Sequence, residues 1–415
     1  MQAENKKNTI KTLSFGCRLN ALEAEKIQNM LKPYVNAAIV VNTCAVTAEA
    51  ERQSGQAVRK LVRENPNVPV WVTGCAATRN RELFHVLENT IVIHNRDKMN
   101  LSAYLDGLNN LPCSIKNPTI TKFSHQEQKL SKQFVQIQNG CNHNCAYCIT
   151  RQLRGPAVSF DYETILADVQ VAMENGFGEI VLTGIDIASY VHKKDGKLFQ
   201  LSDLCHHLLT DVPQIKRLRL SSIDPAVPDV EKIIDLIHRE PRMMPHLHCS
   251  MQSGSDTILR AMGRRHSAQQ VRKLVMQAAG KITFSWDIIC GFPGETDKLF
   301  NETIALAQET KPIKIHAFPF SPRPGTPAAD MPEQVDRSVS KKRVKIIDDL
   351  AHKNRSDFMD SQIGKTVQVL VEANNIARCP HDIGIKITGA TIAPRTICDV
   401  KIIGVDGDYF IGNMI

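Results

Sequence analysis

Three cysteines in one short segment carry the clearest chemical signal in the sequence. Cys141, Cys145 and Cys148 lie in CNHNCAYC, a CxxxCxxC pattern. Cysteines this close together indicate metal ligation in a protein without an export signal. Structural zinc needs four Cys or His ligands, and His143 within the segment is the candidate for the fourth. Three thiolates on a four-iron, four-sulfur cluster instead leave one iron open to a small chelating molecule, and the spacing favours this interpretation.

Three more cysteines each follow an apolar, β-rich run. Cys17 follows TLSFG, Cys44 follows AAIVVNT and Cys75 follows VPVWVTG, with helical patterns between them. Strands alternating with helices predict a parallel sheet, whose carboxyl ends line a ligand crevice. Any one of these cysteines alone is more typical of core packing, but together they indicate a second ligand set. The remaining cysteines lack ligand spacing and are interpreted as packing residues: Cys113, Cys205, Cys249, Cys290, Cys379 and Cys398.

The elements that would position these cysteines indicate an α/β protein of three domains. The alternation of strand and helix patterns over residues 9–112 predicts the parallel α/β sheet domain. Residues 127–357 contain six strand-then-helix units, with strands near FVQIQ, EIVLTG, RLRLSS, HLHCSM, FSWDII and KIHAFP, which predict a partial (β/α)6 barrel. Residues 361–415 alternate short apolar runs with Gly and Asn turns, as in a small β-barrel.

Composition sets the class of protein. The chain has 415 residues, of which 42 % are hydrophobic and 23 % charged, as in ordinary globular proteins. Its net charge of +8 would attract a polyanion such as RNA, although many globular proteins carry a similar surplus. The segment MQAENKKNTI is polar, and no window approaches about 18 consecutive apolar residues. We therefore expect no signal peptide, no membrane span and a cytoplasmic location.

The cluster segment resembles the radical S-adenosylmethionine (SAM) superfamily. The resemblance rests on CxxxCxxC with the aromatic Tyr147, placed after the first strand of a βα barrel. It implies that Cys141, Cys145 and Cys148 are catalytic and hold a 4Fe-4S cluster whose open iron binds SAM. Reduction of SAM there would give a 5′-deoxyadenosyl radical, with the protein orienting the reactants and excluding water.

Further segments resemble the methylthiotransferases within that superfamily. FGCRLN, NTCAVT and TGCAAT are similar to the three cysteine boxes of the family's N-terminal domain, and the C-terminal tail is similar in part to its RNA-binding TRAM domain. The resemblance implies that Cys17, Cys44 and Cys75 hold an auxiliary 4Fe-4S cluster. FGCRLN, rather than GCQMN, and the VQIQNGC entry to the cluster loop look most like the group that acts on threonylcarbamoyladenosine in the tRNA anticodon stem-loop.

The same resemblance implies a set of SAM and substrate contacts. Gly178-Glu179 resembles the superfamily's GE motif, which accepts hydrogen bonds from the SAM amino group. Cofactor contacts are also expected from Tyr147 and, at the ends of later strands, from Ser222, Gln252 and Asp287. Candidates for tRNA phosphates or for the threonyl carboxylate are the arginines at 151, 154, 264, 265 and 323, with Lys341-Lys342-Arg343 as a further phosphate candidate.

Several alternatives remain open at this stage. The same architecture serves methylthiotransferases for isopentenyladenosine in tRNA and for an aspartate of a ribosomal protein. A chain of this kind that had lost turnover would be an iron–sulfur RNA-binding regulator. An active enzyme implies an electron donor such as flavodoxin or ferredoxin, and the sequence carries no indication of oligomeric state.

Overall fold

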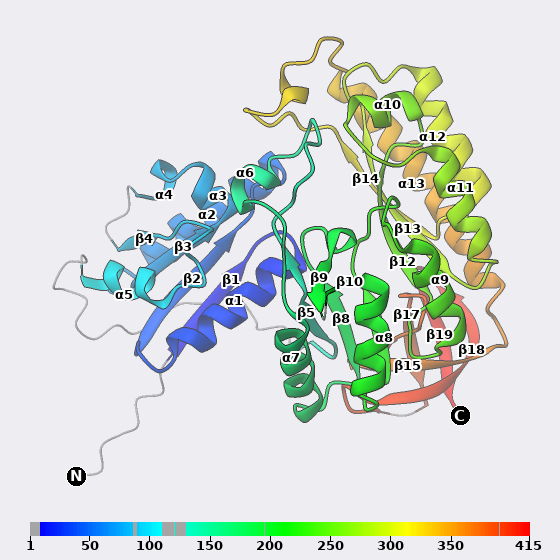
Figure 1. The fold of residues 1–415 in the computed structure, drawn as a ribbon, viewed down its shortest axis with the longest axis horizontal. Helices are drawn as coiled ribbons and strands as arrows, with labels where there is room; N and C mark the ends of the chain where they lie inside the picture. Colours follow the sequence, from blue (N-terminus) through cyan, green and yellow to red (C-terminus); the bar gives the residue numbers. More distant parts are fainter. Residues whose placement is uncertain (1–8, 86–88, 110–119, 121–129, 195, 390) are drawn as a thin grey trace.

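The computed structural model describes residues 9–85, 89–109, 120, 130–194, 196–389 and 391–415. We call residues 9–109 the N-terminal unit, 130–360 the central unit and 366–414 the C-terminal barrel. Figure 1 shows the N-terminal unit in blue and cyan beside the central unit, with the C-terminal barrel in red below it. The predicted α/β class, with a small β-barrel at the end of the chain, is confirmed.

The N-terminal unit is a parallel sheet in the order β1-β2-β3-β4. Every residue of β2 and β3 is buried, because helices cover both faces of the sheet. β4 was not predicted. The elements are β1 (Thr9–Ser14), α1 (Arg18–Leu31), β2 (Ala37–Thr43), α2 (Ala48–Glu64), β3 (Val70–Gly74), α3 (Cys75–Arg79), α4 (Glu82–His85), β4 (Thr90–Val92) and α5 (Leu101–Asn109).

The central unit contains the six predicted parallel strands. They form two three-stranded sheets, β11-β8-β5 and β12-β13-β14, and single bridges to residues 243 and 249 connect β11 and its following loop with the β12 side. Their apolar side chains and the surrounding helices share one core, so the arrangement is a partial barrel. The strands are β5 (Gln133–Gln136), β8 (Glu179–Thr183), β11 (Arg217–Leu220), β12 (His246–Gln252), β13 (Thr283–Cys290) and β14 (Lys314–Pro319).

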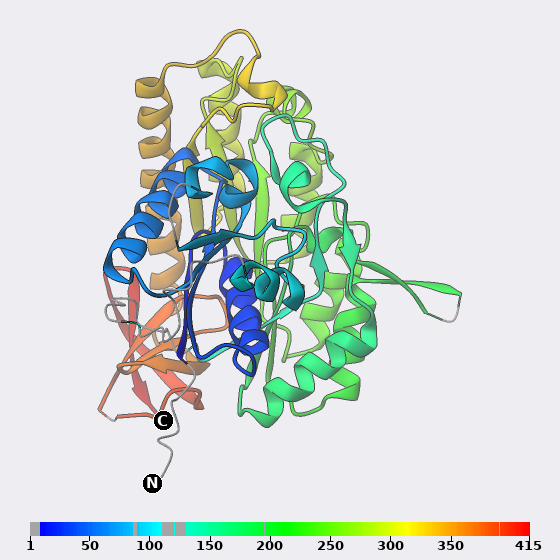
Figure 2. The ribbon, with the colours of Figure 1, turned by 90° about the vertical axis from the view of Figure 1, so that its left-hand side faces the viewer.

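The helices of the central unit lie outside these strands (Figure 1). The β9–β10 hairpin projects from the body in Figure 2. The remaining elements are β6 (Gln138–Asn139), α6 (Thr150–Arg154), β7 (Val158–Ser159), α7 (Tyr162–Glu174), η1 (Ile187–Ser189), β9 (Val191–Lys194), β10 (Lys197–Gln200), α8 (Leu201–Asp211), α9 (Val230–Arg239), α10 (Asp256–Ala261), α11 (Ala268–Gln277), α12 (Asp297–Thr310), η2 (Pro327–Ala329) and α13 (Arg337–Asp360).

The C-terminal barrel closes through five strands in the order β15-β16-β17-β19-β18. Alternate side chains of these strands form a separate apolar core, as expected for a small barrel. The strands are β15 (Thr366–Ala373), β16 (Ile376–Arg378), β17 (Gly384–Thr388), β18 (Ile397–Asp406) and β19 (Tyr409–Met414). Among the described helices, none is both long enough and apolar enough to cross a membrane.

Candidate active site

The CxxxCxxC segment is a loop between β6 and α6, held by backbone hydrogen bonds to distant parts of the central unit. The N–H of Cys141 donates to the carbonyl oxygen of Gly155 at 3.1 Å, and the N–H of Ala146 donates to that of Met262 at 2.9 Å. The three cysteines of the loop lie within eight residues, and the N–H of Cys148 donates to the carbonyl oxygen of Cys145 at 3.0 Å. Burial raises the pKa of Cys141 to about 11. These thiols would therefore release protons on binding a metal cluster.

A buried arginine lies against this first cysteine trio. Nη1 of Arg264 is 3.7 Å from Sγ of Cys145, and its Nη2 is 2.9 Å from Oδ2 of Asp224. Burial raises the pKa of Cys145, while the guanidinium acts in the opposite direction. Tyr147 packs against the apolar cluster beside α10, and burial raises the pKa of its hydroxyl. The loop thus combines an apolar anchor with a positive charge.

Sequence reasoning missed Asp186, which follows the carboxyl end of β8. Its carboxylate lies 2.6 Å from Nε2 of His143 and accepts a hydrogen bond from Ser189. Ligand atoms of Cys141, His143 and Asp186 all lie within 4.8 Å of one another. This group takes only one thiol of the cysteine trio, so it differs from the zinc site considered from the sequence. An acidic residue directly after a barrel strand was the available signal.

The second cysteine trio lies at the carboxyl edge of the N-terminal sheet. Cys17 precedes α1, Cys44 follows β2 and Cys75 begins α3, so all three lie at the ends of neighbouring strands. Gly16 has φ +86°, and a Cβ there would lie 2.5 Å from Sγ of Cys44, so a glycine is needed at this position. Burial raises the pKa of Cys44 to about 11 and also raises that of Cys75. The strands therefore bring together cysteines that are far apart in sequence.

The structure corrects the roles expected for three of the arginines. Arg154, Arg264 and Arg323 have side chains no more than 7 % exposed, and each is paired with a carboxylate of the protein. A buried guanidinium that is already paired cannot also reach a phosphate at the surface. Arg151 and Arg265 are exposed and remain candidates for tRNA contact. Arg343 of the predicted basic cluster is also buried, 2.9 Å from Glu295.

The structure does not support the expected contact between Glu179 and SAM. Glu179 is the first residue of β8, at the end of the barrel opposite the cysteine loop. Its carboxylate is fully buried and pairs with Arg217 at 2.7 Å and Arg219 at 2.9 Å. A Cβ on Gly178 would lie 2.7 Å from Cδ1 of Ile397 in the C-terminal barrel. Both residues therefore join the two units instead of facing the cofactor.

A large cavity of about 990 Å³ separates the N-terminal and central units. Ser222, His248 and Asp287 line its central-unit side, while Cys17 and Arg18 line it from the N-terminal unit. Nε2 of His248 is 3.0 Å from Oδ2 of Asp287. One cysteine of the second trio therefore opens on a space that also contains Ser222, just after β11, and the His248–Asp287 pair from within β12 and β13. A pocket with a few polar side chains is typical of a ligand site.

Gln252, the other expected rim residue, is the last residue of β12. It is half-buried, has φ +68° and lies at an irregularity in the register between β12 and β13. A left-handed conformation at a residue other than glycine is uncommon and occurs often near functional sites. Contact between Gln252 and SAM stays a prediction.

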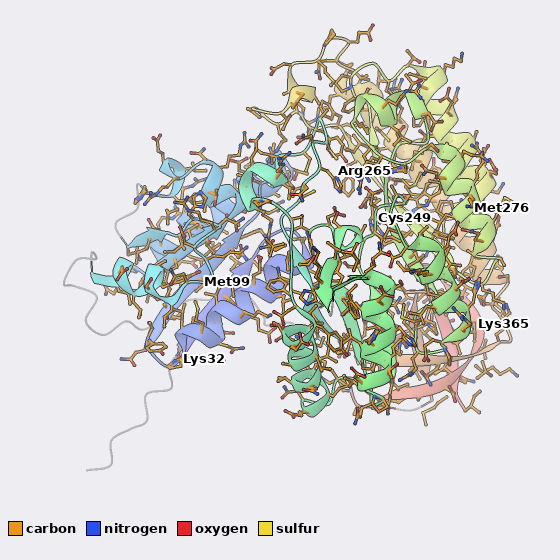
Figure 3. The ribbon with its side chains drawn as sticks, viewed as in Figure 1. Lys32, Met99, Cys249, Arg265, Met276 and Lys365 are labelled. Atoms are coloured by element: carbon orange, nitrogen blue, oxygen red, sulfur yellow. The ribbon has the colours of Figure 1, made fainter. Side chains whose placement is uncertain are left out.

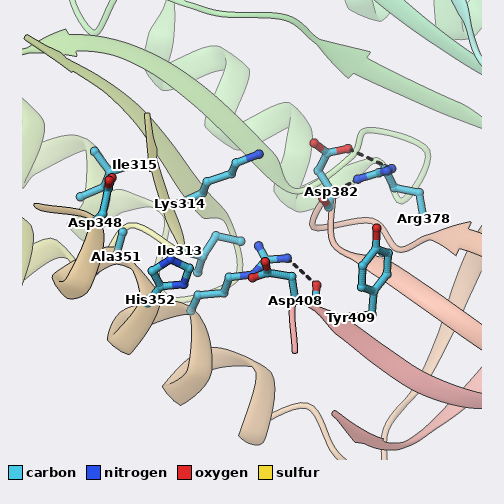
Figure 4. Close-up of a pocket in the computed structure, with 12 residues that line it drawn as sticks. Ile313, Lys314, Ile315, Asp348, Ala351, His352, Arg378, Asp382, Asp408 and Tyr409 are labelled. Atoms are coloured by element: carbon cyan, nitrogen blue, oxygen red, sulfur yellow. Dashed lines mark hydrogen bonds and ion pairs between the residues drawn. The ribbon is translucent and has the colours of Figure 1, made fainter. Parts of the chain in front are cut away.

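A second cavity of about 310 Å³ lies between β14, α13 and the C-terminal barrel (Figure 4). Its polar lining is largely paired: Arg378 binds Glu372 at 2.9 Å, and Arg355 binds Asp408 at 3.2 Å. None of the cysteines lines this cavity, and the Arg355–Asp408 pair connects the two units.

The remaining described cysteines agree with the packing role expected for them, apart from one that is only half-buried. Cys249 lies within β12 (Figure 3) and, like Cys205 and Cys290, belongs to the core of the central unit. Cys379 is buried in the C-terminal barrel and Cys398 is half-buried. Cys113 lies outside the described residues.

Comparison with known families gives two matches. The Radical SAM superfamily profile matches residues 135–307, and that of "Uncharacterized protein family UPF0004" matches residues 9–93. The threonylcarbamoyladenosine tRNA methylthiotransferase MtaB of Rickettsia prowazekii is 37 % identical over 96 % of this chain and 95 % of its own length. The protein of that name from Bacillus subtilis is 31 % identical over 88 % of this chain and 85 % of its own.

A relative with a different printed substrate is also similar. The tRNA-2-methylthio-N(6)-dimethylallyladenosine synthase of Ehrlichia canis is 29 % identical over 86 % of this chain and 86 % of its own length. Among solved structures, the radical SAM methyltransferase TsrM of Kitasatospora setae aligns over 78 % of this chain and 77 % of its own, with TM-score 0.56 and 11 % identity. At that identity the likeness concerns the fold alone.

Proposed function

The chain belongs to the radical SAM methylthiotransferase family, and we propose that it adds a methylthio group to carbon 2 of threonylcarbamoyladenosine beside the tRNA anticodon. Its support is near full-length similarity to relatives that carry this activity in their names, at 37 % and 31 % identity. The relatives named for dimethylallyladenosine fall slightly lower, at 29 %. The geometry adds two cysteine trios, one on each of the two units that face each other.

The residues of the first trio fit the cluster that the superfamily uses. Three thiols share one loop beside a buried guanidinium, and thiolates bound to iron carry negative charge. Cys141, Cys145 and Cys148 would hold this 4Fe-4S cluster, and SAM bound to it supplies the radical chemistry. Arg264 would stabilise the negative charge, and the apolar packing of Tyr147 would keep water from the loop.

We assign a second 4Fe-4S cluster to Cys17, Cys44 and Cys75. Its support is their convergence at one edge of the N-terminal sheet. Cys17 lines the large cavity, so a group held at this trio would be accessible to a base bound there.

The cavity supplies contacts for the substrate and SAM. Ser222 and the Asp287–His248 pair offer hydrogen-bonding groups for the cofactor or the adenine, and Gln252 and Asp186 are further candidates at strand ends. Arg18 is exposed in this cavity and has no hydrogen-bond or ion-pair partner among the described residues. We assign it to the threonyl carboxylate, which a guanidinium binds bidentately.

The proposal also covers the domain limits of the chain, its partners and its cellular location. The domains are assigned as 9–112, 127–357 and 361–415, the last contributing to tRNA binding. An external one-electron donor such as flavodoxin or ferredoxin would reduce the cluster that binds SAM. The substrate, the anticodon stem-loop of tRNA, and the free thiols of all described cysteines favour the cytoplasm.

The opening of Cys17 on the cavity that side chains of the barrel also line carries this proposal, because both reaction partners could meet there. Its test is mass spectrometry of tRNA nucleosides from a strain lacking the gene. We expect loss of the methylthio group from threonylcarbamoyladenosine alone. Loss from isopentenyladenosine, or an unmethylthiolated ribosomal protein with intact tRNA, would replace the substrate. Unchanged nucleosides and no SAM cleavage by the purified protein would favour the RNA-binding regulator.

A further inference from the structure

A buried carboxylate next to the second cysteine trio is shared by two buried cations. Glu23 of α1 is 1 % exposed. Its Oε1 is 2.8 Å from Nη1 of Arg154, and its Oε2 is 2.5 Å from Nζ of Lys98. Nη2 of Arg154 also donates to Oδ1 of Asn20 at 2.6 Å. Burial, followed by the charge of Arg154, lowers the pKa of Lys98, so two basic side chains compete for one carboxylate in this buried group.

A second, partly exposed group near Cys44 has the same ratio of basic side chains to carboxylates. Glu51 of α2 lies 2.7 Å from Nη1 of Arg79 and 3.4 Å from Nη2 of Arg323. Arg323 is 4 % exposed and donates to the carbonyl oxygen of Ala45, the residue after Cys44. Here too, two cations face one carboxylate.

Two buried arginines beside the second trio come from the central unit. Arg154 ends α6, directly after the CxxxCxxC loop, and its Nη2 and the Sγ of Cys17 both contact Oδ1 of Asn20, at 2.6 and 3.8 Å. Arg323 belongs to the segment after β14, and its Nη2 donates to the carbonyl oxygen of Ala45, the neighbour of Cys44 in the chain. The positive charges around the second trio therefore come partly from the N-terminal unit and partly from the central unit.

An uncompensated buried cation is costly, so excess positive charge in the interior indicates an anion at the same place. Thiolates on a metal cluster are such an anion, because metal binding removes the thiol protons. We propose that Arg154 and Arg323 are counter-charges that the central unit supplies to the cluster of the second trio, and that they raise its reduction potential. This proposal rests on the second cluster assigned above.

The expected rise in the reduction potential follows from the charge of the arginines. One-electron reduction adds one negative charge to the cluster, and a nearby cation stabilises the reduced form more than the oxidised form. Removing one guanidinium charge should therefore make reduction harder. Arg154 and Arg323 would be positioning residues, since they act through the cluster and not on the substrate.

The test is a redox titration of the reconstituted full chain, with dithionite as reductant and electron paramagnetic resonance as readout. Replacing Cys141, Cys145 and Cys148 together by Ala leaves one cluster, so the signal comes from the second trio alone. In this background, we expect Arg154→Met to lower the ratio of reduced to oxidised cluster at least tenfold at the unsubstituted midpoint, about 59 mV for one electron. Arg323→Met should shift the midpoint in the same direction.

Matched variants separate charge from damage to the fold. Arg154→Lys keeps the charge and should keep the midpoint close to its original value. Arg52→Met removes an exposed arginine of the N-terminal unit, which holds the second trio, and should leave the midpoint unchanged. An unchanged midpoint in both methionine variants, with iron content retained, would overturn the proposal. If they lose iron, retention by Arg154→Lys supports it, whereas equal loss contradicts it. Absence of any cluster at Cys17, Cys44 and Cys75 in the starting protein would refute the second-cluster assignment instead.

Discussion

Replacing Glu179 by Gln distinguishes a structural role for this residue from the SAM contact expected from the sequence. In the structure, its carboxylate pairs with Arg217 and Arg219, and Asp382 supplies a second negative charge that acts on both guanidinium groups. Arg217 donates in turn to the carbonyl oxygens of residues 378 and 379 at 3.1 and 3.2 Å, and Arg219 donates to that of Pro380 at 3.1 Å. The substitution would remove the carboxylate that two buried guanidinium groups share, where the central unit packs against the C-terminal barrel.

The size of the expected loss in stability follows from the burial of Glu179 and its two arginines. Side-chain exposure is 0 % for Glu179 and Arg217 and 6 % for Arg219, so water screens these charges little. Breaking a buried pair of this kind costs about 3–5 kcal/mol of the free energy of unfolding. Burial acts to raise the pKa of Glu179, but Arg219 and Arg217 outweigh it and hold the pKa at about 2, below the ordinary 4.5. This stabilisation is complete above pH 4.5 and is lost as the pH falls towards 2.

Urea unfolding and hydrogen exchange at neutral pH measure this effect. We expect the first unfolding transition of Glu179→Gln to move to lower urea, and amides of β15–β19 to exchange faster. SAM affinity per assembled cluster should stay unchanged, as it should in the control Glu302→Gln, which alters an exposed glutamate of α12. Unchanged stability together with weaker SAM binding would refute the structural role and restore the cofactor contact.

Three further outcomes are expected. Cys145→Ala should abolish SAM cleavage to 5′-deoxyadenosine under dithionite, whereas Cys44→Ala should keep the cleavage and lose methylthio insertion. Liquid chromatography of the products measures both activities. Equal loss of both activities in the two variants would contradict separate roles for the two cysteine trios. Arg18→Gln should raise KM for tRNA bearing threonylcarbamoyladenosine by about tenfold, the loss of one charge-assisted contact, with SAM cleavage retained; an unchanged KM would remove the carboxylate assignment. Burial lowers the pKa of His246 to about 3, so stability should fall as the pH drops from 6.5 towards 3, and circular dichroism of His246→Gln should show a smaller decrease.

The sequence predicted the elements well because strand and helix periodicity is local. The runs before Cys17, Cys44 and Cys75 are strands, and parallel strands bring their carboxyl ends together whatever their separation in sequence. Neighbouring residues thus sufficed to predict the convergence of the second trio.

The partners of charged residues could not be predicted in this way. The Gly178-Glu179 pair was assigned from a motif, yet its role depends on arginines of β11 and on the docked C-terminal barrel. Arg154 and Arg323 were expected to face tRNA, but the packing of the two units buries them against Glu23 and Glu51. Such pairs are set by tertiary contacts that composition and periodicity do not encode.

The most direct test of the account is an assay of the reconstituted chain with SAM, reductant and tRNA that carries threonylcarbamoyladenosine. With roughly eight irons per chain, as two four-iron clusters require, mass spectrometry should detect the 2-methylthio nucleoside together with 5′-deoxyadenosine. Full iron loading and SAM cleavage without that nucleoside, or modification of isopentenyladenosine in its place, would contradict it.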